Sequence, residues 1–459
     1  MGWPRRAVAS ALDLVLNSGS MMATTGVTSV LGVVYWWVAA HEFPPHAVGL
    51  AGALISAMTL LGVVSTVGFS TALFPEMADR RPETRRALLL GALLAVAVVG
   101  AYLGTVWQAI TPRLRPELGL PGLSAGTSLF FGFAVALTAL TLVLDQALIA
   151  LLRGGLQLFR NAAFAAVKLL VLGGAALLLR DRGAGVILAT WVIGNLASLV
   201  GLAVFVLVTG GWRALAIPRP RLPGRLRGVA VVHHIFNLAL TAPGWILPLL
   251  ATVLISATAN AYFYASWTVA AFVFVGPLAL TTVLYAVGAQ PSRQLGHPLR
   301  LSLLLSLLWA LLGTAGCALL GSRALGFFGH AYASAGPVLL ILALSAFPQV
   351  AKLHYVALVR LGEGFGAGIL VVTAGGVLEV GLAAAGAVHF GLRGLAGGYL
   401  AANLLEAFVV LPAVLRSVAG TREERLETVP AGPIWLVPEA RPLTGPWERW
   451  GPWEVWSAP

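Results

Sequence analysis

The stretch GGWRALAIPRPRLPGRLRG, residues 210–228, lies near the middle of a 459-residue chain and decides how the rest of it is organised. It carries five arginines, three prolines and no acidic residue, between long and almost unbroken apolar segments. We interpret it as a basic cytoplasmic linker that joins two membrane-embedded lobes, residues 1–209 and 229–417. Residues 418–459 differ in composition and are expected to form a disordered cytoplasmic tail rich in Trp and Pro.

The composition excludes an ordinary soluble domain. Hydrophobic residues make up 59% of the chain, charged residues 10%, and the mean hydropathy is +0.90. A membrane-spanning helix needs about 20 mainly apolar residues, and the apolar runs do not alternate as barrel strands would. The sequence therefore predicts an all-α polytopic membrane protein with about 12 transmembrane helices. The predicted spans are Val8–Ala39, Val48–Phe74, Ala87–Ile110, Ala125–Leu152, Leu158–Leu179, Val186–Val208, Val229–Ser256, Ala261–Val287, Leu299–Leu320, Ala335–Val359, Phe365–His389 and Gly394–Leu415.

Arginine placement predicts the orientation. With both termini in the cytoplasm, nineteen arginines fall in inner segments and six in outer loops. This asymmetry agrees with the positive-inside rule and places the protein in the cell membrane with both ends inside. The net charge of +12 follows from these loop arginines, which favours contact with anionic membrane lipids over nucleic acid binding.

The two halves share a pattern. The spans that begin at Val48 and Ala261 lie about 212 residues apart, and each is followed by an arginine-containing inner segment. Such an offset is typical of duplicated six-helix halves, which usually enclose a path between them.

Several short stretches carry a resemblance to a known family. They are GVVYWWVAA at 32–40, VGL at 48–50, ALISA at 53–57, FPE at 74–76, FN at 236–237, AYFYA at 261–265 and FFG at 327–329. Over residues 10–415 the chain resembles bacterial polysaccharide flippases of the multidrug, oligosaccharidyl-lipid and polysaccharide exporter superfamily. The resemblance implies two six-helix lobes that form a V with a central cavity.

The resemblance also implies a function. A flippase of this kind moves a lipid-linked oligosaccharide, of the undecaprenyl-pyrophosphate type, across the cytoplasmic membrane by alternating access for the export of cell-surface polysaccharide. Glycosyltransferases or the polymerase of the same pathway would be its partners. Two alternatives stay open: an ion-coupled antiporter for drugs or other small molecules within the same superfamily, and a membrane scaffold that transports nothing.

Ionisable residues inside spans are costly and therefore mark candidate sites. Lys168 lies near the middle of the fifth predicted span and either meets the substrate phosphate or pairs with Asp145 of the fourth span. Glu379 and Glu406 lie near the middle of the last two spans. With Asp145, they are candidates for a proton or sodium site that couples an ion gradient to transport; the alternative is a protonated acid hydrogen-bonded to another helix.

Other residues are candidates for substrate contacts. The cavity candidates, besides Lys168, are His233, His234, Asn237, Lys352 and His354. The candidates for stacking on sugar rings are Tyr35, Trp37, Tyr262 and Tyr264, although aromatic belts at the membrane interface explain such residues equally well.

No pattern for catalysis or a cofactor is present. The sequence lacks a phosphate-binding glycine loop, a serine nucleophile motif and metal-ligand spacing. One cysteine, Cys317, allows no intramolecular disulfide. We therefore expect no enzyme activity, no cofactor and no metal.

Overall fold

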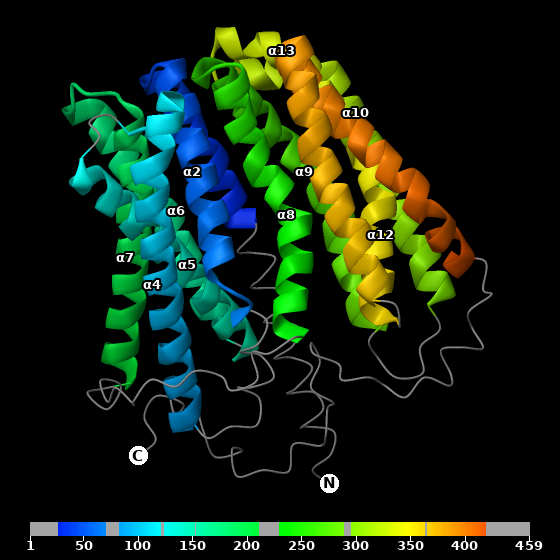
Figure 1. The fold of residues 1–459 in the computed structure, drawn as a ribbon, viewed down its shortest axis with the longest axis horizontal. Coiled ribbons are helices and arrows are strands. Elements are labelled where there is room, and N and C mark those ends of the chain that lie inside the picture. The colour runs from blue at the N-terminus through cyan, green and yellow to red at the C-terminus, as the bar shows by residue number, and fades with distance from the viewer. Residues whose placement is uncertain are drawn as a thin grey trace. The chain divides into compact units, whose positions relative to one another are not determined.

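The computed structural model describes residues 26–69, 82–120, 124–151, 153–210, 229–288, 295–362 and 365–418 (Figure 1). Every regular element within these ranges is a helix. The predicted linker beyond Gly210 and the predicted tail beyond Val418 lie outside the described residues, so both stay predictions.

The chain divides into two compact units. Among the described residues, those up to Phe43 and those from Ala57 to His234 form unit 1. Pro44–Ser56 and the residues from Ile235 onward form unit 2. One helix, α2 (Pro45–Ser65), therefore contributes its first part to unit 2 and its second part to unit 1.

Unit 1 is built from long apolar helices. A helix at residues 26–42 and the end of α2 are followed by α4 (Pro82–Leu114), the short 3-10 helix η1 (Pro116–Leu118), α5 (Ala125–Ala150), α6 (Gly154–Leu178) and α7 (Ala184–Gly210). Helices α4 and α5 pack along their length, as do α6 and α7. Small residues make this close packing feasible. At Gly132 of α5, for example, a Cβ atom would meet the side chain of Thr105 and the carbonyl of Ala101 on α4.

Unit 2 has the same kind of architecture. Its elements are α8 (Val229–Leu254) from Ile235 onward, α9 (Ala257–Gly288), α10 (Gly296–Gly326), the 3-10 helix η3 (His330–Ala335), α11 (Gly336–Leu344), α12 (Ala346–Leu361) and α13 (Phe365–Val418). Within this unit, the carbonyl of Gly49 in α2 accepts a 2.7 Å hydrogen bond from the Asn260 amide of α9. Because Gly49 has no side chain, its backbone can approach α9 closely enough for that bond.

Helix α13 consists of two segments that meet at Gly391, whose φ of 59° is left-handed and suits glycine. The segments run antiparallel with their backbones in close contact. A Cβ on Gly386 would meet the carbonyl of Gly394, and a Cβ on Gly398 would meet that of Leu382. These two segments correspond to the eleventh and twelfth predicted spans.

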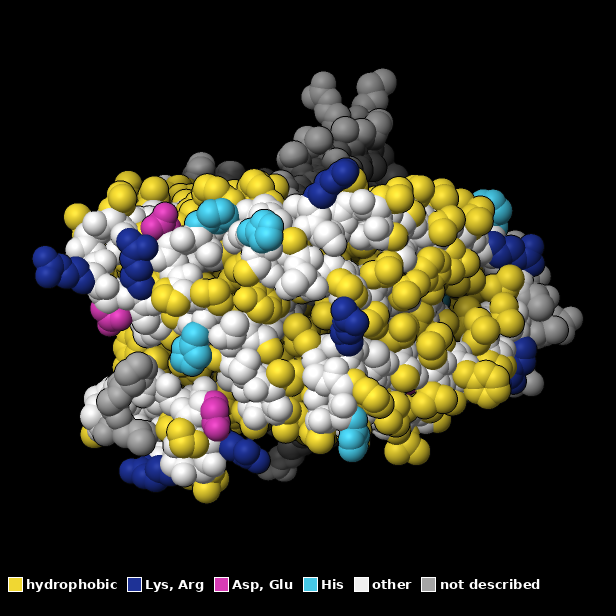
Figure 2. Space-filling view, turned by 90° about the horizontal axis from the view of Figure 1, so that it is seen from above, with side chains coloured by type: hydrophobic (Ala, Val, Ile, Leu, Met, Phe, Trp, Pro, Cys, Tyr) yellow, Lys and Arg dark blue, Asp and Glu magenta, His cyan; other side chains and the backbone are white. Residues whose placement is uncertain are grey.

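The hydrophobic surface matches a membrane protein. Ten helices of the described ranges are long and apolar enough to cross a membrane. Many large apolar side chains are exposed on them, including Leu177, Val208, Leu319, Phe390 and Phe408. Figure 2 shows the molecule from above, where hydrophobic side chains cover much of the face and most charged side chains lie toward its rim. The predicted class, an all-α polytopic membrane protein, is confirmed.

One predicted span is wrong in its extent. The sequence predicts a single helix over Val48–Phe74, but α2 ends at Ser65 and a turn follows. Val67 and Gly68 have positive φ angles of 44° and 82°. The hydroxyls of Ser65 and Thr66 donate to the carbonyls of Leu61 and Val63, which competes with continued helix formation. Hydropathy alone did not reveal this turn because the sequence on both sides of it is apolar.

Candidate functional site: buried charges within each unit

Unit 2 contains a buried cluster of one lysine and two glutamates. Lys352 Nζ, from α12, lies 2.9 Å from Glu379 Oε1 and 2.8 Å from Glu406 Oε2. The three side chains are 8%, 3% and 6% exposed. Glu379 and Glu406 come from the two antiparallel segments of α13, so the ammonium joins three separate helical segments. We call these three residues the Lys–Glu–Glu triad.

The backbone of α13 makes room for the triad. A Cβ on Gly375 would overlap the carboxyl group of Glu406, so any larger residue at 375 would displace that carboxylate. Gly375 lies one turn before Glu379, and the sharp return of the chain at Gly391 brings both positions opposite residue 406. The triad therefore depends on a glycine notch as well as on its charged residues.

Further polar groups accompany the triad. Gln349 of α12 donates to the Tyr399 hydroxyl at 2.5 Å, and Asn403 donates to the Tyr399 carbonyl. His354, also on α12, bonds Ser302 of α10 through Nε2 and the Val350 carbonyl through Nδ1. His354 is fully buried and thus serves a packing contact between α10 and α12.

Unit 1 contains a buried lysine in a different setting. Lys168 of α6 is 5% exposed. Its Nζ lies 3.9 Å from the ring centre of Trp191, 4.6 Å from that of Phe164 and 4.8 Å from that of Tyr35. Each ring can attract a cation through its π face. We call Lys168 and these three rings the aromatic lysine box.

Two hydrogen-bond donors of the aromatic lysine box, Lys168 Nζ and Trp191 Nε1, have no acceptor among the described residues. Within the described ranges, no carboxylate or carbonyl oxygen accepts a hydrogen bond from Lys168 Nζ, and the buried Trp191 Nε1 has no hydrogen-bond partner. Both groups can only donate. Tyr35, by contrast, is bonded through its hydroxyl to Thr190 Oγ1 at 2.6 Å and to the Ile187 carbonyl. Gly194 lets α7 approach Lys168 closely, because a Cβ at 194 would lie only 3.0 Å from Lys168 Cβ. This close packing and the bonded Tyr35 restrict the position of the lysine side chain.

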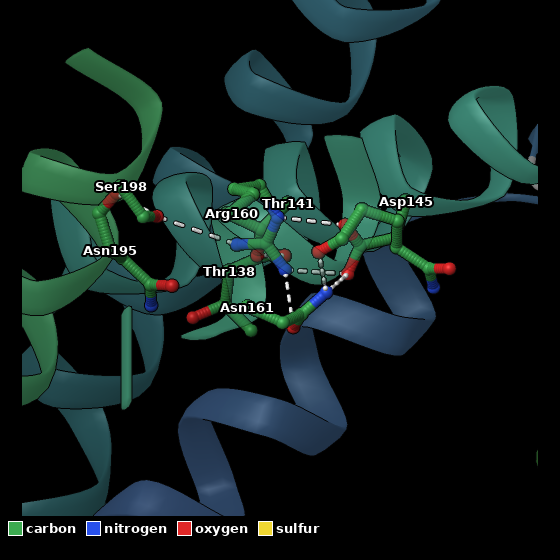
Figure 3. Close-up of polar contacts among 8 residues, drawn as sticks. Thr138, Thr141, Asp145, Arg160, Asn161, Asn195 and Ser198 are labelled. Atoms are coloured by element: carbon green, nitrogen blue, oxygen red, sulfur yellow. Dashed lines mark hydrogen bonds and ion pairs between the residues drawn. The ribbon is translucent and has the colours of Figure 1, made fainter. Parts of the chain in front are cut away.

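The expected alternative pairing of Lys168 with Asp145 is wrong. Asp145 of α5 binds Arg160 of α6 instead, with Nε to Oδ1 at 2.7 Å and Nη2 to Oδ2 at 2.5 Å (Figure 3). Asn161 bonds the same carboxylate, and Arg160 Nη1 reaches Ser198 of α7 at 3.5 Å. Arg160 and Lys168 are eight residues apart, or about 12 Å along a helix, and the planar guanidinium is the better bidentate partner.

The remaining predicted residues lie outside these clusters. Asn237 accepts a 2.8 Å bond from Arg360 Nη2, and His233 and His234 lie near the start of α8. Trp37 packs against the ring of His41, and Tyr262 packs edge-to-face on Tyr332. Tyr264 lies against Gly52 of α2. The sugar-stacking roles of Tyr35, Trp37, Tyr262 and Tyr264 stay predictions, although the structure buries Tyr35 fully.

The fold is shared with solved transporters. An inward-facing multidrug resistance MATE family transporter of the MOP superfamily aligns with a TM-score of 0.67 at 15% identity, over 86% of this chain and 96% of its own. A MATE structure in complex with MaL6 aligns with a TM-score of 0.60 at 16% identity, over 90% and 97%. A MOP superfamily transporter from Pyrococcus furiosus aligns with a TM-score of 0.61 at 14% identity, over 89% and 96%.

At these identities the likeness establishes a common fold. The chain is a multi-pass membrane protein with the fold of MOP superfamily transporters. Its sequence matches no protein-family model and no curated protein.

Sequence reasoning missed three parts of these clusters. It did not single out Arg160 as a candidate, although this residue lies inside the predicted span Leu158–Leu179 and inside α6. It placed Lys352 among the substrate contacts, whereas the Lys352 ammonium lies between the carboxylates of Glu379 and Glu406. It did not consider Trp191, which lies within the first third of α7, inside a predicted span.

Proposed function

We propose that this protein is an alternating-access transporter that moves a lipid-linked oligosaccharide of the undecaprenyl-pyrophosphate type across the cytoplasmic membrane for surface polysaccharide export. One observation carries the choice of substrate. Lys168 is a buried cation whose ammonium has no acidic partner among the described residues. An anionic phosphate group on the substrate would supply the acceptor that the aromatic lysine box lacks.

A lysine buried in the membrane without a counter-ion has a high free-energy cost. Holding an ionisable group at mid-membrane costs about 2.5 to 3.5 kcal/mol even on lenient scales, and the three rings offset that cost only partly. The only acid of α5, Asp145, binds Arg160, about two helical turns from Lys168. A lysine that is left without a carboxylate is therefore suited to a ligand that arrives and leaves.

The orientation and partners follow from the same proposal. Both termini would lie in the cytoplasm, where the arginine-rich inner segments contact anionic lipids. The lipid-linked substrate would come from cytoplasmic glycosyltransferases, and the product would pass to a polymerase on the other side.

A second candidate is a drug or small-molecule antiporter. It is favoured by the fold that the chain shares with a multidrug resistance transporter. The Lys–Glu–Glu triad has two acids and one base. It would therefore bind a cationic compound better than it would bind a phosphate.

A reconstituted assay separates these functions. The full chain would be reconstituted in proteoliposomes with a fluorescent polyprenyl-pyrophosphate sugar lipid. Flipping would be measured as the change in the fraction of fluorescent lipid that a membrane-impermeant reductant cannot reach. We expect protein-dependent flipping that falls at least tenfold in Lys168→Met. Leu170→Met, on the exposed side of the same helix, is the matched control and should flip normally.

Parallel vesicles would carry a cationic dye in place of the sugar lipid. Dye transport without lipid flipping would favour the antiporter and overturn the proposal. Movement of neither probe by folded protein would favour the scaffold.

A further inference from the structure

We propose that Glu379 and Glu406 of unit 2 bind a proton and do not bind sodium. The Lys352 ammonium, which is covalently attached to α12, occupies the position that a sodium ion would take between them. This inference concerns the ion and not the transported substrate, so it stands or falls separately from the proposed function. It rests on where the ammonium lies, on the charge of the triad and on one buried oxygen atom.

The ammonium occupies the place between the two acids. Its Nζ is within hydrogen-bond distance of Glu379 Oε1 and Glu406 Oε2 at the same time. Two buried carboxylates that face one another would otherwise attract a mobile cation. A sodium ion can reach both oxygens only by displacing a group that is covalently attached to α12. The described residues also contain no group of three or more His, Cys, Asp or Glu that could hold a metal ion.

The charge of the triad leaves room for one proton. With all three side chains ionised, one ammonium faces two carboxylates, and one negative charge is uncompensated. Burying such a charge is costly. The second oxygen of Glu406, Oε1, is buried and has no hydrogen-bond partner. A proton on this oxygen would neutralise the triad without disturbing either contact of Lys352.

The other ionisable groups on the elements packed around the triad make other contacts or lie near helix ends. On α10 they are His297 near the start, Arg300, which bonds the Val418 carbonyl, Cys317, which packs on an apolar cluster, and Arg323 in the last turn. On α13, the Tyr399 hydroxyl accepts a hydrogen bond from Gln349, and on α12, His354 uses one ring nitrogen on Ser302 and the other on the Val350 carbonyl. Helix α11 has no ionisable side chain, and α9 presents only tyrosines. On α8, which approaches Gly376 through Ala239 and Pro243, the only ionisable residues are His233 and His234 near the helix start.

A purely structural ion pair would need one glutamate. The second carboxylate adds a desolvation cost, and the chain accommodates it with the glycine notch at Gly375. The extra acid is thus built into the backbone, which points to a role in binding a proton.

Sodium binding is tested by thermal unfolding of the purified full chain at alkaline pH, in NaCl and in choline chloride at equal ionic strength. We expect the wild type to unfold at the same temperature in both salts. Lys352→Met, which leaves two facing carboxylates, should be stabilised by sodium by several degrees in a saturable way. Lys352→Gln serves as the second variant if the methionine protein does not fold.

Proton binding is tested by infrared spectroscopy. We expect the wild type to show the C=O stretch of a buried protonated carboxylic acid, and Glu406→Gln to lose it. A sodium-specific stabilisation of the wild type that Glu406→Gln removes would overturn the proposal. A folded Lys352 variant that is not stabilised by sodium would also overturn it. The same holds if the wild type and Glu406→Gln give the same infrared spectrum in the C=O stretching region.

Discussion

Each unit of this protein buries a lysine within a membrane-spanning helix, and the two are held by opposite means. Lys352 of unit 2 lies between two carboxylates, whereas Lys168 of unit 1 lies among three aromatic rings. The first lysine is fully neutralised within its own unit. The second is attracted by rings that cannot accept its hydrogen bonds in the way an anion would.

The predicted duplication of the two halves bears on this difference. Lys168 of the fifth span and Glu379 of the eleventh are 211 residues apart, close to the 212-residue offset on which that prediction rests. Gly194 and Glu406 are related in the same way. Corresponding positions therefore carry a cation and a glycine in unit 1 but two acids in unit 2. We infer that the halves have divided their tasks, unit 1 for an anionic group and unit 2 for a proton.

The largest expected effect comes from removing the neutralised lysine. Lys352→Met leaves two buried carboxylates without a cation, which should destabilise the protein by about 3 to 5 kcal/mol. The measurement is thermal or denaturant unfolding in detergent without sodium. Adding Glu379→Gln and Glu406→Gln to the same protein should restore most of the loss. An unchanged midpoint for Lys352→Met alone would mean that Lys352 and Lys168 do not differ as described.

The next effect concerns the ion pair of unit 1. Asp145→Asn removes the charge that faces Arg160, which is 4% exposed, and should destabilise the protein by about 2 to 3 kcal/mol. The same substitution should leave the response to anionic lipid unchanged, because Lys168 does not contact Asp145. If Asp145→Asn has no effect on unfolding but abolishes lipid binding, the assignment of Asp145 to Arg160 is incorrect.

A smaller effect tests the glycine notch. Gly375→Ala places a methyl group against the carboxyl of Glu406 and should cost about 1 to 2 kcal/mol by overpacking. Gly381→Ala, on the same segment but with open space at its Cβ, is the control and should be neutral or slightly stabilising. Equal unfolding midpoints for the two variants would contradict the claim that the missing side chain at Gly375 makes space for the Glu406 carboxyl.

The smallest effect on stability is expected at the aromatic lysine box. Lys168→Met loses the cation–π contacts but also removes a buried charge, so its unfolding free energy should change by less than about 1 kcal/mol. Unfolding midpoints of Lys168→Met and Leu170→Met would be compared. A loss as large as that of Lys352→Met would indicate that Lys168 has a structural partner after all.

The sequence predicted the spans well and the side-chain pairs poorly, for a physical reason. Hydropathy places a helix in the membrane, and within the described residues each predicted span coincides with helix, apart from the turn after Ser65 in the second span and the break at Ser345 between α11 and α12 in the tenth. The part of the first predicted span before residue 26 lies outside the described residues. Pairing depends on how each helix is rotated and how closely it packs. Lys352 could be matched to Glu379 and Glu406 only once glycines 386, 394 and 398 had fixed the two segments of α13 against one another.

In unit 1, too, the depth of a residue along its helix did not predict its partner. Lys168 and Asp145 lie on consecutive spans, and a lysine side chain can extend toward the interface. Arg160, two turns closer to Asp145, takes the carboxylate first. The sequence did identify Lys168, Glu379 and Glu406 correctly as deep ionisable residues, because the burial cost makes such residues rare wherever they occur.

The most direct test of this account is the thermal shift of the full chain with a short polyprenyl phosphate, measured against the uncharged polyprenol of equal length. The wild type is predicted to be stabilised by the phosphate and not by the alcohol. Lys168→Met should lose this headgroup-specific shift, while Leu170→Met keeps it. A phosphate-specific shift that survives in Lys168→Met would contradict the account, as would equal shifts with phosphate and alcohol in the wild type.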